Sequence, residues 1–161
     1  MKRHKSQHVL AIIIGISLCL AFGCLSSVLT QPALSQWYID LIKPFYSPPN
    51  WIFAPVWVLL YTVIGWAAGR VWFFGRRHRW GKTALYHFGA QIIFSGLWIL
   101  VFFGLKNPLW AVIVILILWI LVERTIYWFL LVDQKASMML YPYFVWISFS
   151  ILLNLAIVVL N

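Results

Sequence analysis

The chain has 161 residues, of which 64% are apolar, 19% are aromatic and only 9% are charged. Soluble domains carry about 25% charged residues, and three acidic with twelve basic residues cannot supply a soluble surface. The composition therefore excludes a soluble protein and predicts a membrane protein with one domain.

Five apolar segments are each long enough to cross a bilayer as a helix, which takes about 20 residues. We therefore predict an all-α membrane protein, a single domain formed by a bundle of five transmembrane helices. The approximate spans are 9–29, 51–74, 83–104, 109–131 and 136–160, with an outward loop at 31–50. The first span follows a basic head, which is also typical of a signal peptide, so the sequence leaves its cleavage open.

Two spans carry small residues four positions apart. These are Gly15, Cys19, Gly23 and Ser27 in the first span and Gly65 and Gly69 in the second. Small residues at this spacing allow another helix to approach closely. The partner of the glycine pair can be a helix of the same subunit or of a second subunit. For the first span, the general abundance of small residues in membrane helices explains the pattern equally well.

The connection at residues 37–57 is rich in proline and aromatic residues. Its prolines fix φ and lack an N–H, so we expect an extended or turning chain from 43 to 49. Its aromatic side chains have polar tips, which suit either a membrane interface or a lid over a pocket. These aromatic residues are Trp37, Tyr38, Phe45, Tyr46 and Trp51.

Polar and aromatic residues share one face of the third span and one face of the fifth. They are His87, Gln91, Ser95, Trp98 and Phe102 in the third span and Tyr143, Trp146, Ser150 and Asn154 in the fifth. Such faces should turn inward, because unsatisfied polar groups are costly in lipid. With Trp110 they could enclose an aromatic cavity under the 37–51 loop that holds a planar hydrophobic molecule. Hydrogen bonds between helices alone would explain the same pattern.

The basic residues are distributed unequally between the two ends of the spans. Eight lie in the head and in the turns after the second and fourth spans, whereas the opposite end has only Lys43 and Lys106. The excess predicts a cytoplasmic N-terminus and a C-terminus outside. These residues then serve topology and contact with anionic lipid headgroups, so no nucleic acid is expected as a partner.

The sequence predicts no catalytic residue and no metal site. The sequence has only three acidic residues, too few to favour a pair of catalytic carboxylates, and its four histidines lack metal-ligand spacing. No serine stands in a nucleophile motif. Glu123 and Arg124 are neighbours on a helix and should not pair well with each other. Because Arg70 lies at a similar depth, we predict an Arg70–Glu123 ion pair, with snorkelling of both arginines as the alternative.

The pattern Trp-Tyr-x-x-Leu-x-Lys-Pro-x-x-x-Pro-Pro-x-Trp over residues 37–51, followed by Pro-Val-Trp at 55–57, resembles the tryptophan-rich sensory protein and translocator protein family. The resemblance implies a homodimer and a cavity for a tetrapyrrole such as protoporphyrin or haem, with benzodiazepine-type drugs as possible ligands. It implies a sensor, regulator or carrier of porphyrin intermediates that needs no cofactor. Light-driven porphyrin oxidation, proposed for bacterial members, is a further possibility.

By motif position, the resemblance implies these cavity residues: Trp51, Trp98, Trp110, Trp146, Ser150, Leu153 and Asn154. Two positions depart from the family pattern, with Ser95 where asparagine is usual and Ser150 where alanine is usual. Residues 155–161 lack the aromatic and basic pair of animal members, which puts sterol binding in doubt and favours a bacterial cell membrane. A small-molecule transporter and a structural scaffold remain as alternative functions.

Overall fold

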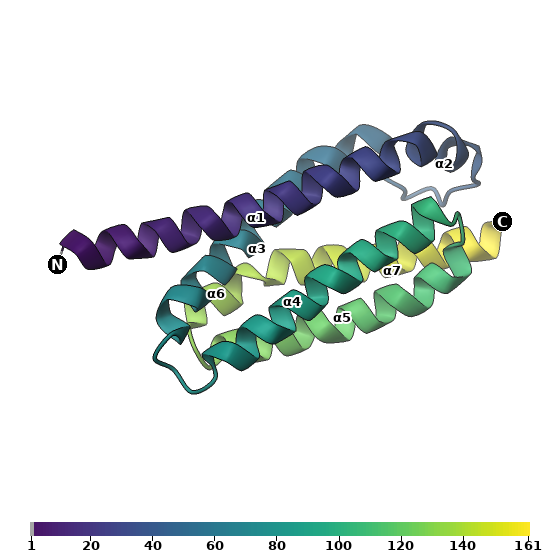
Figure 1. The fold of residues 1–161 in the computed structure, drawn as a ribbon. Helices are drawn as coiled ribbons and strands as arrows, with labels where there is room; N and C mark the ends of the chain where they lie inside the picture. Colours follow the sequence, from purple (N-terminus) through teal and green to yellow (C-terminus); the bar gives the residue numbers. More distant parts are fainter. Residues whose placement is uncertain (1) are drawn as a thin grey trace.

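The computed structural model describes residues 2–161, and the side chains of all of these except residues 2–5 and 29. The chain is helical over most of its length (Figure 1). The elements are α1 (Lys2–Ser35), α2 (Trp37–Asp40), α3 (Asn50–Gly75), α4 (Gly81–Ile99), the π-helix η1 (Leu100–Gly104), α5 (Pro108–Leu130), α6 (Gln134–Met139) and α7 (Tyr141–Leu160).

Five helical stretches are long and apolar enough to cross a membrane, so the predicted fold class is confirmed. They are Ser6–Val28, Asn50–Gly75, Gly81–Gly104, Pro108–Leu130 and Gln134–Leu160. The N-terminus lies at one end of the bundle, and the C-terminus lies with α2 at the other end (Figure 1). We call these the N-terminal end and the loop end.

The observed helices differ in their bounds from the predicted spans near two prolines. α1 continues to Ser35 through Pro32, and α2 follows after Gln36, so only Gln36 and residues 41–49 of the 31–50 segment are non-helical. The last span is divided into α6 and α7 because Pro142 sits in the first turn of α7, where its missing N–H costs nothing. The predicted turning chain over 43–49 is present.

A close helix contact joins α1 to α3 through small residues singled out in the sequence. A Cβ atom added to Gly65 would lie 2.7 Å from the Gly15 carbonyl oxygen, and one added to Gly69 would lie 2.5 Å from that of Ala11. Both distances are shorter than real Cβ contacts allow, so the two backbones meet there. The Gly65 and Gly69 motif therefore serves a contact within the subunit.

This contact predicts unequal effects of the same substitution at two glycines. Gly69→Ala should destabilise the protein by about 1–3 kcal/mol, the usual cost of overpacking a close contact. Gly89→Ala is the matched control, because no heavy atom lies within 4 Å of its added Cβ. Thermal unfolding in detergent measures both, and equal melting temperatures would contradict the close approach of α1 and α3.

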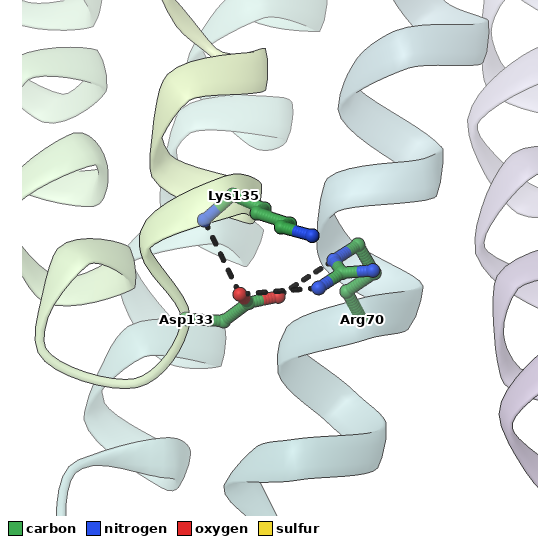
Figure 2. A network of polar contacts seen from close by, with 3 residues as sticks. All are labelled: Arg70, Asp133 and Lys135. Carbon is green, nitrogen blue, oxygen red and sulfur yellow. Dashed lines mark hydrogen bonds and ion pairs between the residues drawn. The ribbon is translucent and has the colours of Figure 1, made fainter.

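The predicted Arg70–Glu123 ion pair is wrong, because Arg70 pairs with Asp133 instead (Figure 2). Arg70 donates from Nε to Asp133 Oδ2 at 2.6 Å and from Nη2 to Oδ1 at 3.2 Å. Asp133 also accepts the backbone N–H of Lys135 and so caps α6. Glu123 instead pairs with its neighbour Arg124 at 3.3 Å, both largely exposed, which the sequence analysis had considered unfavourable.

The ion pair ties α3 to the turn between α5 and α6, and both side chains are mostly buried, at 17% and 12% exposure. The sequence prediction failed because similar depth along two helices says nothing about the direction in which each side chain points. α3 packs against α6, and the carboxylate that begins α6 therefore reaches Arg70.

Removing one partner of this pair should destabilise the fold strongly. Asp133→Asn keeps a residue that can cap α6 but leaves Arg70 without its counterion, at a cost of up to about 3 kcal/mol. Glu123→Gln, the control, should cost less than about 1 kcal/mol because its pair is exposed. If thermal unfolding shows Glu123→Gln to be the more damaging variant, the assignment of the pair is wrong.

Candidate functional site

A cavity of about 510 Å³ lies at the loop end of the bundle. The second half of α1, the first half of α3, the α4–η1 segment and α7 form its walls, and Tyr38 of α2 borders it. It lies at the end of the bundle where the connection between the first two spans runs.

Seven of the predicted site residues line this cavity. They are Tyr38, Trp51, Trp98, Trp146, Ser150, Leu153 and Asn154. They come from the loop, the third span and the fifth span, so the structure brings together the segments that the sequence analysis combined.

Five other predicted site residues do not line the cavity. Trp37 packs edge-on against Phe102, with ring centroids 5.6 Å apart. Trp110 is 61% exposed and contributes no wall. Gln91, Ser95 and Tyr143 are buried, but they lie outside the cavity lining.

Ser95 belongs to a second layer behind the cavity wall. Its hydroxyl lies 3.3 Å from the Tyr61 hydroxyl, and Tyr61 itself lines the cavity. His87, the first member of the same helix face, lies instead near Trp128, with ring centroids 5.6 Å apart. Only one end of the predicted face of the third span therefore borders the cavity, and the rest of that face packs against other helices.

One wall of the cavity was not predicted from the sequence. α3 supplies this wall through Phe53, Trp57 and Tyr61. Trp57 and Tyr61 are stacked, with centroids 5.4 Å apart and ring planes 27° apart. Trp57 also meets Trp146 edge-on. The spacing of four between these three residues was the available signal, since residues four apart share one helix face.

Asn154 holds Trp98 in place. Trp98 donates from Nε1 to Asn154 Oδ1 at 3.2 Å, and Asn154 Nδ2 donates to the Pro108 carbonyl oxygen at 2.9 Å. The carboxamide therefore uses both of its ends within the protein. Its role is to orient an aromatic wall and to join α4, α5 and α7.

Two cavity residues have a buried polar atom with no hydrogen-bond partner within the described chain. They are the Tyr38 hydroxyl oxygen and Trp146 Nε1. A buried donor without a partner is costly, and a ligand with an acceptor group would remove that cost. Burial raises the pKa of the Tyr38 phenol above its ordinary value, against a smaller lowering by the nearby Ser47 hydroxyl, so the phenol stays protonated and able to donate at neutral pH.

The non-helical loop at 41–49 is attached to α7. Asn161 Oδ1 accepts the backbone N–H of Ile42, and Asn161 Nδ2 donates to the Ile42 carbonyl oxygen, both at 3.0 Å. Tyr46 donates from its hydroxyl to the Leu152 carbonyl oxygen at 3.4 Å. Lys43 places its ammonium 4.7 Å from the centre of the Tyr38 ring. The loop is thus attached to α7 and α2 at the end of the bundle where the cavity lies, and residues 41–49 are not part of the cavity lining.

These features define an integral multi-pass membrane protein with a large cluster of aromatic residues around one cavity. Within the described chain, no three histidine, cysteine or acidic side chains gather as metal ligands would. The sequence matches the TspO/MBR family over residues 15–160, and the chain belongs to that family.

Relatives match nearly the whole chain. Tryptophan-rich protein TspO of Chlorobaculum tepidum is 35% identical over 97% of this chain and 99% of its own length. Tryptophan-rich protein TspO of Archaeoglobus fulgidus is 38% identical over 96% and 99%. The human translocator protein is 30% identical over 87% and 84%. The family resemblance inferred from residues 37–57 is therefore confirmed.

Loss of the Asn154 side chain should weaken the fold through Trp98. Asn154→Ala leaves the Trp98 indole N–H and the Pro108 carbonyl without partners, which should cost about 1–3 kcal/mol. In a Trp98→Phe background the donor is already absent, so the same substitution should cost less. Thermal unfolding of the two single variants and the double variant measures this coupling, and strictly additive losses would show that the hydrogen bond does not form.

Proposed function

We propose that the protein binds a porphyrin-type tetrapyrrole, such as protoporphyrin or haem, in the aromatic cavity and acts as a sensor, regulator or carrier of porphyrin intermediates. The observation that carries this proposal is the cavity of about 510 Å³ bordered by Trp57, Tyr61, Trp98 and Trp146. Ligand sites commonly measure about 300–1,000 Å³ and combine aromatic walls with a few polar groups.

A flat conjugated ring suits these walls for two reasons. The stacked Trp57 and Tyr61 rings offer a broad face to the cavity, and aromatic contacts favour offset stacking or edge-to-face packing. The unpartnered Trp146 Nε1 and Tyr38 hydroxyl would donate to a propionate or carbonyl oxygen of the ligand. Benzodiazepine-type drugs, which also combine flat rings with a carbonyl, are secondary ligands of the same proposal.

Two further features of the proposal concern the membrane. Eight basic residues against two support a cytoplasmic N-terminal end and an outer loop end, in a bacterial cell membrane. The cavity would then open toward the outside under the loop at 41–49. A homodimer stays a prediction, and it would need a surface other than Gly65 and Gly69, which contact α1.

Titration of the detergent-solubilised protein with protoporphyrin, followed by quenching of tryptophan fluorescence, tests the proposal. We expect saturable quenching, and Trp146→Phe and Trp57→Phe should each weaken binding about threefold to tenfold, the value of one aromatic contact. Trp66→Phe is the matched control, because it removes one indole that is 42% exposed and lies outside the cavity lining.

Three outcomes separate the candidate functions. Saturable binding that both cavity variants weaken, with Trp66→Phe unchanged, supports a tetrapyrrole site in the cavity. Linear quenching in all four proteins would mean partition into the micelle and would favour a structural scaffold. Saturable binding with ligand-dependent flux in liposomes would identify a small-molecule transporter.

A further inference from the structure

A second and smaller groove lies at the N-terminal end of the bundle, between α1 and the end of α3. Its volume is about 190 Å³. Its lining is apolar except at two residues, and consists of Gln7, Leu10, Ala11, Ile14, Trp72 and Arg76. None of these residues borders the aromatic cavity.

The two polar residues of the groove lie at the depth of lipid headgroups. Gln7 lies two residues after Lys5, the last residue of the basic head, and Arg76 directly follows the membrane-spanning stretch Asn50–Gly75. Leu10 and Ile14 lie one and two turns further into the span. The groove therefore begins at the polar boundary of the bilayer and continues into its apolar region.

Arg76 is held at the groove without an acidic partner. Its guanidinium lies 5.1 Å from the centre of the Trp72 ring, an arrangement in which the cation is attracted to the face of the indole. The three acids of the sequence are all accounted for elsewhere. Asp133 binds Arg70 and Glu123 binds Arg124, whereas the third lies in α2 at the loop end.

Neighbouring charges make this end of the bundle strongly basic. Arg77 and Arg79 are exposed on the same turn, and Lys82 is exposed at the start of α4. Basic residues beside a membrane span attract anionic lipid at about 1 kcal/mol each. Charge alone would attract such lipid diffusely, whereas the groove adds an apolar wall next to one fixed arginine.

We propose that this groove binds one anionic phospholipid. The phosphate lies against the Arg76 guanidinium and the Gln7 carboxamide, both of which can donate hydrogen bonds to it. The upper part of one acyl chain lies against Leu10, Ile14 and Trp72. The groove is smaller than a typical site for a whole ligand, so the rest of the chain follows the exposed surface of α1.

Bound lipid would bridge α1 and α3 beside their glycine contact. Any ligand that binds only the folded state raises the free energy of unfolding, so the lipid should stabilise the bundle at the end opposite the aromatic cavity. The proposal rests on the membrane position of the helices and is independent of the tetrapyrrole proposal.

Native mass spectrometry of the full chain, released from mixed micelles that contain phosphatidylglycerol or phosphatidylcholine, tests the site. We expect one retained phosphatidylglycerol and a higher melting temperature in its presence. Arg76→Gln should weaken retention about fivefold, the effect of one basic residue near anionic lipid. Arg77→Gln is the matched control, because it removes the same charge from the same turn outside the groove lining.

A second variant fills the groove without changing the net charge. Gln7 is exposed, so Gln7→Trp should fold normally, occupy the groove mouth and reduce retention. Loss of retention in Arg76→Gln and Gln7→Trp with a normal Arg77→Gln supports the site. Equal losses in both arginine variants, or equal retention of the two lipids, would overturn it, as would retention unaffected by Gln7→Trp.

Discussion

The backbone contact between α1 and α3 at Gly15, Gly65 and Gly69 determines where the molecule is hollow. Helices in lipid gain little from burying apolar side chains, so close van der Waals approach through small residues carries much of their association. From this contact toward the loop end, side chains separate the two helices. Gly23 faces the Tyr61 ring rather than backbone, and the aromatic cavity lies there. Toward the N-terminal end lies the smaller groove with Trp72.

A second constraint comes from polar groups, which must find partners inside a bundle surrounded by lipid. Some bond back to a carbonyl of their own helix, as Thr125 does to Leu121 and Ser150 to Trp146, and others bond between helices. Trp119 donates from Nε1 to the Ser148 hydroxyl, and Ser137 donates to the Ile126 carbonyl oxygen. The Tyr38 hydroxyl and Trp146 Nε1 find no partner within the described chain, and neither do the Gln91 carboxamide and the Tyr143 hydroxyl outside the cavity lining. Missing partners are therefore not confined to the cavity, but the two at its border are the ones within reach of a bound molecule.

The sequence predicted those features that depend on distance along the chain. Span length identified the five membrane helices, proline spacing identified the non-helical loop at 43–49, and the order of motifs within residues 37–57 identified the family. Helix periodicity also selected Trp98, Trp146 and Asn154, because residues three or four apart share a face. Each of these inferences needs only one helix or loop at a time.

Features that depend on how helices are rotated against one another were not predictable. Arg70 and Glu123 lie at similar depths, yet α3 faces α6, so the partner of Arg70 is Asp133. Trp110 occupies a suitable depth for the cavity but turns outward. Trp57 and Tyr61 have the correct spacing for a cavity wall, but only the position of α1 shows that their face of α3 borders a hollow.

The contact between α1 and α3 and the attachment of the loop at 41–49 differ in the work needed to break them. Separating α1 from α3 would break a continuous backbone contact within the membrane, where no water replaces the lost interactions. Moving the loop at 41–49 breaks the Asn161–Ile42 pair and the Tyr46–Leu152 bond, all near exposed residues. Such bonds contribute only about 0.5–1.5 kcal/mol each because water replaces them. The loop at 41–49 is therefore held less firmly than α1 is held against α3.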